Sequence, residues 1–121
     1  MIDWQEGRQG TGYLKKLLWF GPTPFSTVWF DIHLLKFPVG SGIPWHVDRV
    51  NPGEKHYRLN VYLKGARRGG EFLSKKKPIV NGGFFQLFRP DINAHMVTKV
   101  EEGTRYVLSI GWVTEQYGPL A

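Results

Sequence analysis

The stretch TVWFDIHLLKF at residues 27–37, which continues as PVGSGIPWHVD at residues 38–48, decides the fold class. Its first part is rich in β-branched and aromatic residues, which fit a pleated strand better than a helix. One proline and two glycines then favour a turn, and residues 43–48 follow as a second extended segment. The pattern predicts two successive strands with a tight connection and no helix between them.

The rest of the chain shows the same alternation of short extended segments and turn residues. Residues 12–20 fit either a short helix or a strand, and we expect Gly21–Pro24 to end that segment. The 15 glycines and 8 prolines would heavily destabilise helix interiors. Parallel α/β folds therefore lose their support. The further strands that we expect cover residues 56–64, 70–74, 83–89, 94–100 and 104–113.

These segments predict a mainly all-β protein with at most one short N-terminal helix. Several short strands separated by turn residues are typical of an antiparallel sandwich or barrel of the jelly-roll type. The length of 121 residues fits one domain over residues 1–121. We place its core at about residues 27–113.

The amino-acid composition limits the possible metal ligands, nucleophiles and partners. The sequence contains no cysteine, so disulfides, thiolate metal sites and cysteine nucleophiles are excluded, and a metal would need His, Asp or Glu ligands. A net charge of +6 favours anionic partners. The sequence shows no apolar run long enough for a membrane span and no signal-peptide pattern. We therefore expect no membrane partner and a cytoplasmic location.

The histidines supply a candidate metal site. His46 and Asp48 are two positions apart, so on an extended segment both side chains leave the same face and can reach one ion. His95 is the candidate for a third ligand, because it opens a predicted strand after a turn. Two histidines and one carboxylate with open positions are the arrangement of non-haem Fe(II) oxygenases.

Four segments in sequence order resemble the 2-oxoglutarate/Fe(II)-dependent dioxygenase superfamily, especially its prolyl-hydroxylase-like branch. Residues 35–48 are similar to the approach to the family's His-x-Asp motif, and residues 62–72 to the strand and Gly-Gly-Glu turn that follow it. Residues 84–97 resemble the strand that delivers the distal histidine. Residues 103–112 resemble the last core strand. The resemblance implies a double-stranded β-helix, which is the family's form of the jelly roll.

The resemblance also implies roles for individual residues. Fe(II) would be held by the two histidines and the aspartate named above. Arg105 would hold the distal carboxylate of 2-oxoglutarate, for which its planar, permanently charged guanidinium is well suited. Tyr62 matches the family tyrosine that bonds the same carboxylate. Ser109 lies on the same strand face as Arg105 and could donate a further hydrogen bond to the co-substrate.

The strand at residues 56–64 has one apolar and one polar face, and the polar face is expected to meet solvent or a pocket. Arg58 and Asn60 on that face are assigned tentatively to the substrate or the surroundings of the metal. Phe37 receives the same tentative assignment; it stands where many relatives have a tyrosine and cannot hydrogen-bond the co-substrate. His33 and His56 match no ligand position, so we expect them to be packing or surface residues.

The implied activity is an oxidoreductase reaction that consumes O₂ and 2-oxoglutarate and yields succinate and CO₂. A protein or peptide side chain is the expected target. Two alternatives stay open: a dioxygenase that dealkylates or hydroxylates nucleic acid, which the positive charge would suit, and a non-catalytic jelly-roll binding module with a vestigial metal site. Residues 1–26 offer little chain to shape a substrate groove, so another chain could complete the pocket. The oligomeric state is left open.

Overall fold

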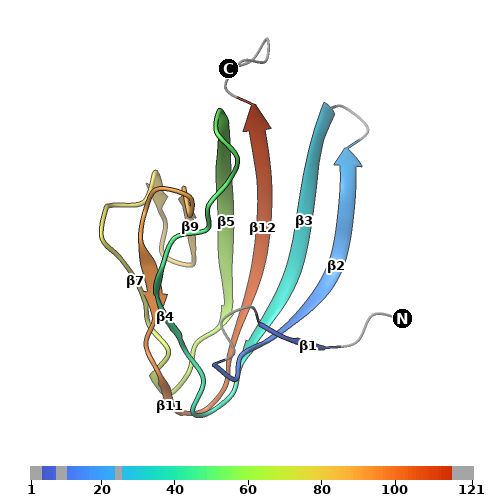
Figure 1. The fold of residues 1–121 in the computed structure, drawn as a ribbon. Helices are drawn as coiled ribbons and strands as arrows, with labels where there is room; N and C mark the ends of the chain where they lie inside the picture. Colours follow the sequence, from blue (N-terminus) through green and yellow to red (C-terminus); the bar gives the residue numbers. More distant parts are fainter. Residues whose placement is uncertain (1–3, 8–10, 24–25, 116–121) are drawn as a thin grey trace.

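The structure, a computed structural model, describes residues 4–7, 11–23 and 26–115. Within these residues the chain forms strands and no helix, which confirms the all-β prediction (Figure 1). None of the described residues belongs to a helix that could cross a membrane. The strands are β1 (Gln5–Glu6), β2 (Leu14–Thr23), β3 (Ser26–Phe37), β4 (Ile43–His46), β5 (Glu54–Lys64), β6 (Arg68–Gly69), β7 (Phe72–Ser74), β8 (Val80–Asn81), β9 (Phe85–Phe88), β10 (His95–Val97), β11 (Val100–Glu102) and β12 (Arg105–Glu115).

Two unequal layers make up the jelly roll. The large sheet has the order β1-β2-β3-β12-β5-β9-β8, with the long strand β12 antiparallel to both β3 and β5. The small sheet has the order β4-β10-β7, and β11 and β6 form a short ribbon beside it. The small sheet faces the large one, and the layers converge near β11 (Figure 1).

The ambiguous N-terminal segment is a strand that runs further than the sequence indicates. β2 continues through Gly21 and Pro22, which pair with Phe30 and Trp29 of β3, so the predicted end at Gly21 is wrong. A proline is tolerated here because β2 lies near the edge of the sheet, where a missing N–H need not break a ladder. Pro24, the last residue of the predicted stop, lies outside the described residues.

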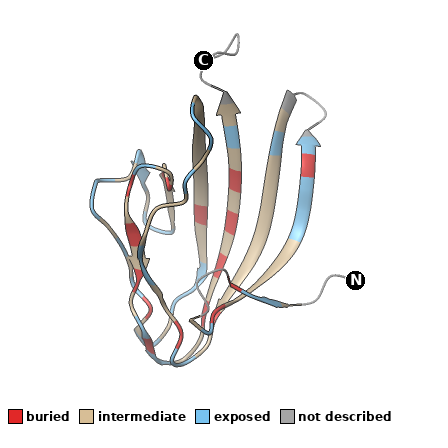
Figure 2. Cartoon of the chain, viewed as in Figure 1, coloured by how far each residue is buried: buried red, intermediate tan, exposed pale blue. Residues whose placement is uncertain are grey.

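Burial alternates along β12. Arg105, Val107 and Ser109 are buried, whereas the residues between them are only partly buried (Figure 2). The buried set faces the small sheet. The hydrophobic core consists of Tyr13, Phe37, Val97, Val100 and Val107. Packing is therefore concentrated near the end where the layers converge, and it leaves space between them further along the strands.

Candidate metal and co-substrate site

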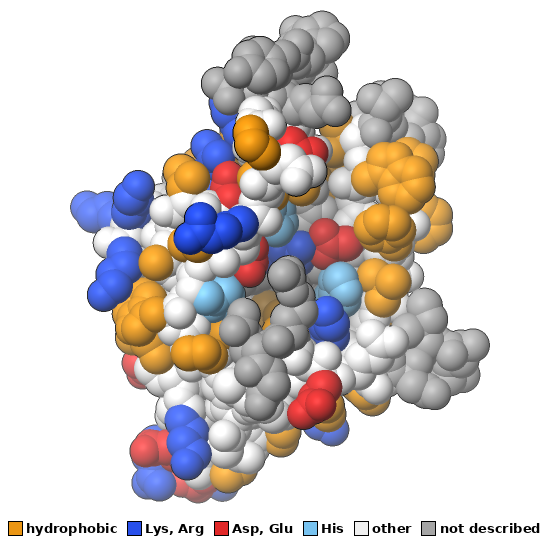
Figure 3. Space-filling model, viewed as in Figure 1, with side chains coloured by type: hydrophobic (Ala, Val, Ile, Leu, Met, Phe, Trp, Pro, Cys, Tyr) orange, Lys and Arg blue, Asp and Glu red, His pale blue; other side chains and the backbone are white. Residues whose placement is uncertain are grey.

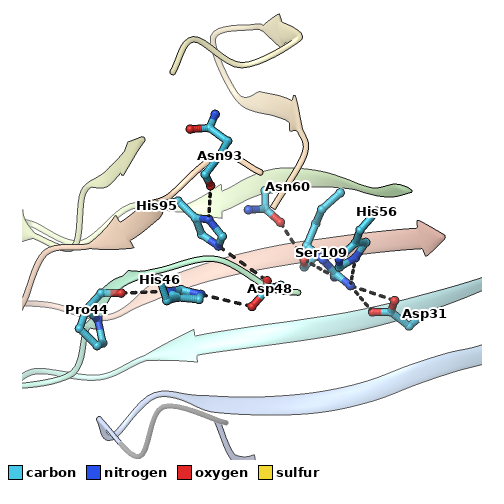
Figure 4. Close-up of polar contacts among 10 residues, drawn as sticks. Asp31, Pro44, His46, Asp48, His56, Asn60, Asn93, His95 and Ser109 are labelled. Carbon is cyan, nitrogen blue, oxygen red and sulfur yellow. Dashed lines mark hydrogen bonds and ion pairs between the residues drawn. The ribbon is translucent and has the colours of Figure 1, made fainter. Parts of the chain in front are cut away.

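The two predicted histidine ligands lie opposite each other on neighbouring strands. His46 of β4 pairs in register with His95 of β10, and their ring centroids are 4.2 Å apart. Asp48 follows β4, and its backbone N–H donates to the Pro90 carbonyl at 2.7 Å. This brings its carboxylate between the rings: Oδ1 is 3.5 Å from His46 Nε2, and Oδ2 is 3.7 Å from His95 Nε2. One ligand atom from each residue lies within 4.8 Å of the other two (Figure 4).

Backbone carbonyls orient both imidazoles. His46 Nδ1 lies 2.8 Å from the Pro44 carbonyl, and His95 Nδ1 lies 2.8 Å from the Asn93 carbonyl (Figure 4). A carbonyl can only accept, so each Nδ1 carries the proton and donates. In a neutral ring with the proton on Nδ1, Nε2 carries the lone pair, and Nε2 is the atom that faces the carboxylate in both residues.

The surroundings of His95 keep its ring neutral and in place. The ring packs between Phe72 and Phe88, with centroid distances of 5.9 and 5.1 Å. Burial lowers the pKa of His95, and the hydrogen bond to the Asn93 carbonyl only partly opposes this. A neutral imidazole is the form that binds a metal. Two neutral imidazole nitrogens and a carboxylate are a donor set suited to Fe(II) with open positions.

Arg105 is a buried cation in the wall of the same cavity. A cavity of about 540 Å³ is lined by the three candidate ligands and by Arg105, among other residues. The Arg105 side chain has no carboxylate within ion-pair distance among the described residues, although the residue is only 5% exposed. Burial lowers its pKa, and interaction with Tyr62 opposes that change. An unpaired buried charge is costly, so this guanidinium is suited to an anion that enters the cavity.

Aromatic rings surround the guanidinium of Arg105. Its Cζ lies 4.8 Å from the centroid of Phe37 and 5.2 Å from that of Tyr62. The hydroxyl of Tyr62 donates to Gln86 Oε1, and burial raises the Tyr62 pKa. Phe37 lines the cavity, whereas Tyr62, which the sequence resemblance assigned to the co-substrate, contacts Arg105 but is not among the residues that line the cavity. The lining also includes Tyr13, which stacks on Phe37 at 5.2 Å and which the sequence analysis did not single out.

The remaining predicted residues form a polar network on the inner face of β3, β5 and β12. Arg58 Nη2 donates to Asp31 Oδ1 at 2.8 Å and Oδ2 at 2.7 Å, and Nη1 donates to Ser109 Oγ at 2.7 Å. Ser109 in turn donates to Asn60 Oδ1 at 2.7 Å. The Ser109 hydroxyl proton, expected to serve the co-substrate, is used within the protein in this structure.

Asp31 anchors this network. Burial alone would raise its pKa, but the hydrogen bond from His33 and the charge and hydrogen bond of Arg58 together hold the pKa well below its usual range. His33 Nδ1 donates to Asp31 Oδ2 at 3.0 Å. His56 accepts a 3.4 Å contact from Arg58 Nη2, and burial and the Arg58 charge lower its pKa.

His33 and His56 both line the cavity, as does Asp31. The sequence analysis, which expected packing or surface roles for both histidines, did not predict that they line the cavity. The available signal was the two-residue period: Asp31 and His33 share a strand face with Phe37, and His56 shares one with Arg58 and Asn60. In Figure 3, histidine and acidic side chains lie near the centre of the view, with hydrophobic side chains to the right and basic side chains to the left.

Several solved structures are similar in fold to this chain. The sequence matches no protein-family model, and no curated protein matches it either. A prolyl-4-hydroxylase from Pseudomonas putida superposes with a TM-score of 0.64 at 16% identity, covering 96% of this chain and 79% of that one. A viral collagen prolyl hydroxylase from Paramecium bursaria Chlorella virus-1, in complex with 2-oxoglutarate, gives 0.54 at 20% identity, covering 73% and 60%.

A third similar structure is the DMSP lyase DddQ from Ruegeria pomeroyi, with a TM-score of 0.55 at 14% identity. The match covers 97% of this chain and 58% of the lyase. At these identities the likeness concerns the fold. The neighbours include hydroxylases and a lyase, so the shared architecture does not select one reaction. The chain therefore has a jelly-roll fold similar to that of two prolyl hydroxylases and a lyase, and the fold agrees with the one that the sequence resemblance implied.

Proposed function

We propose that this protein is an Fe(II)- and 2-oxoglutarate-dependent dioxygenase that hydroxylates a protein or peptide side chain. The observation that carries the proposal is the presence of two complementary features in one cavity: the His46–Asp48–His95 cluster and the buried guanidinium of Arg105. The cluster suits a cation with open coordination positions, and Arg105 suits the far carboxylate of a small dianion. The 2-oxoglutarate complex of the viral prolyl hydroxylase, similar in fold, supports this co-substrate.

Different residues of the cavity would bind the metal, bind the co-substrate and exclude water. The three ligands would hold iron through two Nε2 atoms and one carboxylate oxygen, and iron so bound would supply the activation of O₂. Arg105 would orient 2-oxoglutarate by its distal carboxylate, and the Tyr62 ring, 5.2 Å from the guanidinium carbon, would help to hold the guanidinium in place. Phe37 and the packed core beneath would exclude water from that end of the cavity.

The polar network would face the substrate. Asp31 and Arg58 neutralise each other, and both line the cavity, so they present a fixed dipole. A peptide carries backbone N–H and C=O groups that can bond such a dipole. This supports a peptide substrate, which the proposed reaction would hydroxylate at a side chain.

The test measures succinate formation from 2-oxoglutarate by the intact protein with Fe(II) and O₂, with and without a panel of peptides. We expect iron-dependent succinate formation, stimulated by at least one peptide that gains the mass of one oxygen atom. Asp48→Ala should abolish it. Glu101→Ala, which removes an exposed carboxylate that pairs with Arg68 outside the cavity, is the matched control and should retain metal-dependent turnover. Succinate formation that survives Asp48→Ala would refute the proposal.

A parallel panel of methylated and unmodified oligonucleotides tests the nucleic-acid alternative. Turnover stimulated by oligonucleotides, weakened by added salt and absent with peptides, would transfer the activity to nucleic acid. Protein that binds metal but forms no succinate under any condition would favour the binding-module alternative.

A further inference from the structure

The loop between β9 and β10 contacts two of the three candidate metal ligands through its backbone. It spans residues 89–94 and carries the chain from the large sheet to the small sheet. Near its start, the Pro90 carbonyl accepts the backbone N–H of Asp48 at 2.7 Å. Near its end, the Asn93 carbonyl accepts a hydrogen bond from His95 Nδ1 at 2.8 Å (Figure 4). The placement of the carboxylate relative to the imidazole therefore depends on the conformation of this loop.

An ion pair between Arg89 and Asp91 lies within the same loop. Arg89 Nε donates to Asp91 Oδ1 at 3.2 Å and Nη2 donates to Oδ2 at 2.6 Å, so the guanidinium holds both carboxylate oxygens. The Asp91 side chain is only 4% exposed, and among the described residues no other cation lies within ion-pair distance of it. A buried carboxylate without a partner is costly, so Asp91 favours the loop conformation that keeps Arg89 beside it. Pro90, whose carbonyl bonds a ligand, lies between the two paired residues.

Further contacts anchor the loop to both layers. The Arg89 carbonyl accepts the N–H of Asn93 at 2.9 Å, which closes a turn across the loop. On the large sheet, Arg89 Cζ lies 5.6 Å from the ring centroid of Tyr57 in β5. On the small sheet, Lys75, which follows β7, donates its N–H to the Ala94 carbonyl at 2.9 Å. Arg89 thus connects the large sheet to the carboxylate that shapes the loop.

We propose that the ion pair of Arg89 with Asp91 is a positioning element of the metal site, because it fixes the loop whose carbonyls hold two ligands. Neither residue belongs to the ligand cluster or lines the cavity, so the pair acts on the metal through the loop backbone. This role rests on the metal site of the proposed function, but it requires neither 2-oxoglutarate nor a particular substrate. Groups that orient metal ligands typically contribute roughly 10- to 100-fold to metal affinity.

The test is calorimetric titration of the intact protein with Mn(II), a redox-stable probe, using Arg89→Gln, Asp91→Asn and the double variant. Each single variant should bind Mn(II) about tenfold more weakly than the unmodified protein. The double variant should lose about the same factor, because either single change already breaks the pair. Glu101→Gln is the matched control: it removes a carboxylate from the exposed ion pair with Arg68, outside the cavity, and should leave the affinity unchanged.

A merely structural ion pair would change stability without changing the bound metal. Urea denaturation establishes that each variant is folded under the titration conditions. The electron paramagnetic resonance spectrum of bound Mn(II) reports the symmetry of its ligands, and it should change in both single variants but not in Glu101→Gln. If Asp91→Asn does not fold, Arg89→Gln decides the question, since the Arg89 side chain is 22% exposed.

Equal Mn(II) affinities and spectra of the unmodified protein and Arg89→Gln would overturn the positioning role and leave the proposed function intact. A loss of affinity of the same size in Glu101→Gln would also overturn it, because any broken ion pair would then have this effect. An unmodified protein that binds no Mn(II) would overturn both the positioning role and the proposed function, because it would lack the metal site itself.

Discussion

Arg58 occupies the space above the α-carbon of Gly111. A Cβ built on Gly111 would lie 2.0 Å from Arg58 Nη2 and 2.8 Å from Asp31 Oδ1. The glycine lies in the middle of β12, where its backbone needs no unusual conformation, so its role is to provide space. The ion pair between Arg58 and Asp31 therefore depends on a missing side chain on the neighbouring strand.

The first prediction concerns this space. Gly111→Ala should displace the guanidinium and destabilise the protein by about 1–3 kcal/mol, because the new methyl group meets polar atoms already hydrogen-bonded to each other. Urea denaturation measures the loss. Gly83→Ala is the control, since nothing lies within 4 Å of a Cβ built there. Equal stabilities of the two variants would show that Arg58 relocates freely.

A second prediction concerns Asp31 and pH. The folded-state pKa of Asp31 lies below its ordinary value of 3.8. A depressed carboxylate pKa stabilises the folded state above the unfolded pKa, and this contribution declines as the pH falls below about 4 toward the folded value. Asp31→Asn removes the charge that neutralises Arg58, and it should cost about 1–3 kcal/mol at pH 6.

Urea denaturation of both proteins at decreasing pH checks this prediction. The stability difference between them should shrink as the pH falls below about 4. A difference that stays constant from neutral to acid pH would mean that the Asp31 charge does not stabilise the fold.

The sequence predicted the fold through local signals. β-Branched and aromatic residues in 27–37 and the alternation in 104–113 both become strands of the large sheet, because each can bury one face. β2 was harder: Gly21 and Pro22 signal a break, and only pairing with β3 keeps them extended. The sequence also does not reveal which face of residues 56–64 meets the small sheet. The structure places the small sheet on the polar side, and no described strand covers the apolar side.

The closeness of His46 and Asp48 could be predicted because residues two positions apart leave the same face of an extended segment. The Asp31–Arg58–His33 network could not, since it joins residues 27 positions apart through the register of three strands. Tyr62 and Ser109 show the same limit. The two-residue period predicts the strand face on which each side chain lies, but it does not predict the hydrogen-bond partner. The hydroxyl of Tyr62 donates to Gln86 and that of Ser109 to Asn60, partners that only the folded chain brings close.

A third prediction concerns the support of His95. The Asn93 side chain accepts from the Lys76 N–H at 2.9 Å and donates to the Lys76 carbonyl at 3.0 Å, which fixes the loop whose carbonyl orients His95. Asn93→Ala should weaken metal binding about tenfold, as is typical when a group that orients a ligand is lost. Calorimetric titration with Mn(II) as a redox-stable probe measures this. Asn81→Ala, which removes an exposed asparagine that bonds Gln86, is the control.

The last prediction separates the two halves of the site. Arg105→Gln removes the buried charge but keeps a donor, and it should weaken binding of 2-oxoglutarate to the Mn(II)-loaded protein about tenfold or more. Arg105→Lys retains the charge without the planar fork and should have a smaller effect. Affinity for Mn(II) in the absence of 2-oxoglutarate should be unchanged in both variants, because Arg105 makes no contact with the three ligands. Equal affinity of all three proteins for 2-oxoglutarate would show that the co-substrate, if it binds, is held by another residue, and it would leave the buried guanidinium without the anion that its position in the cavity requires.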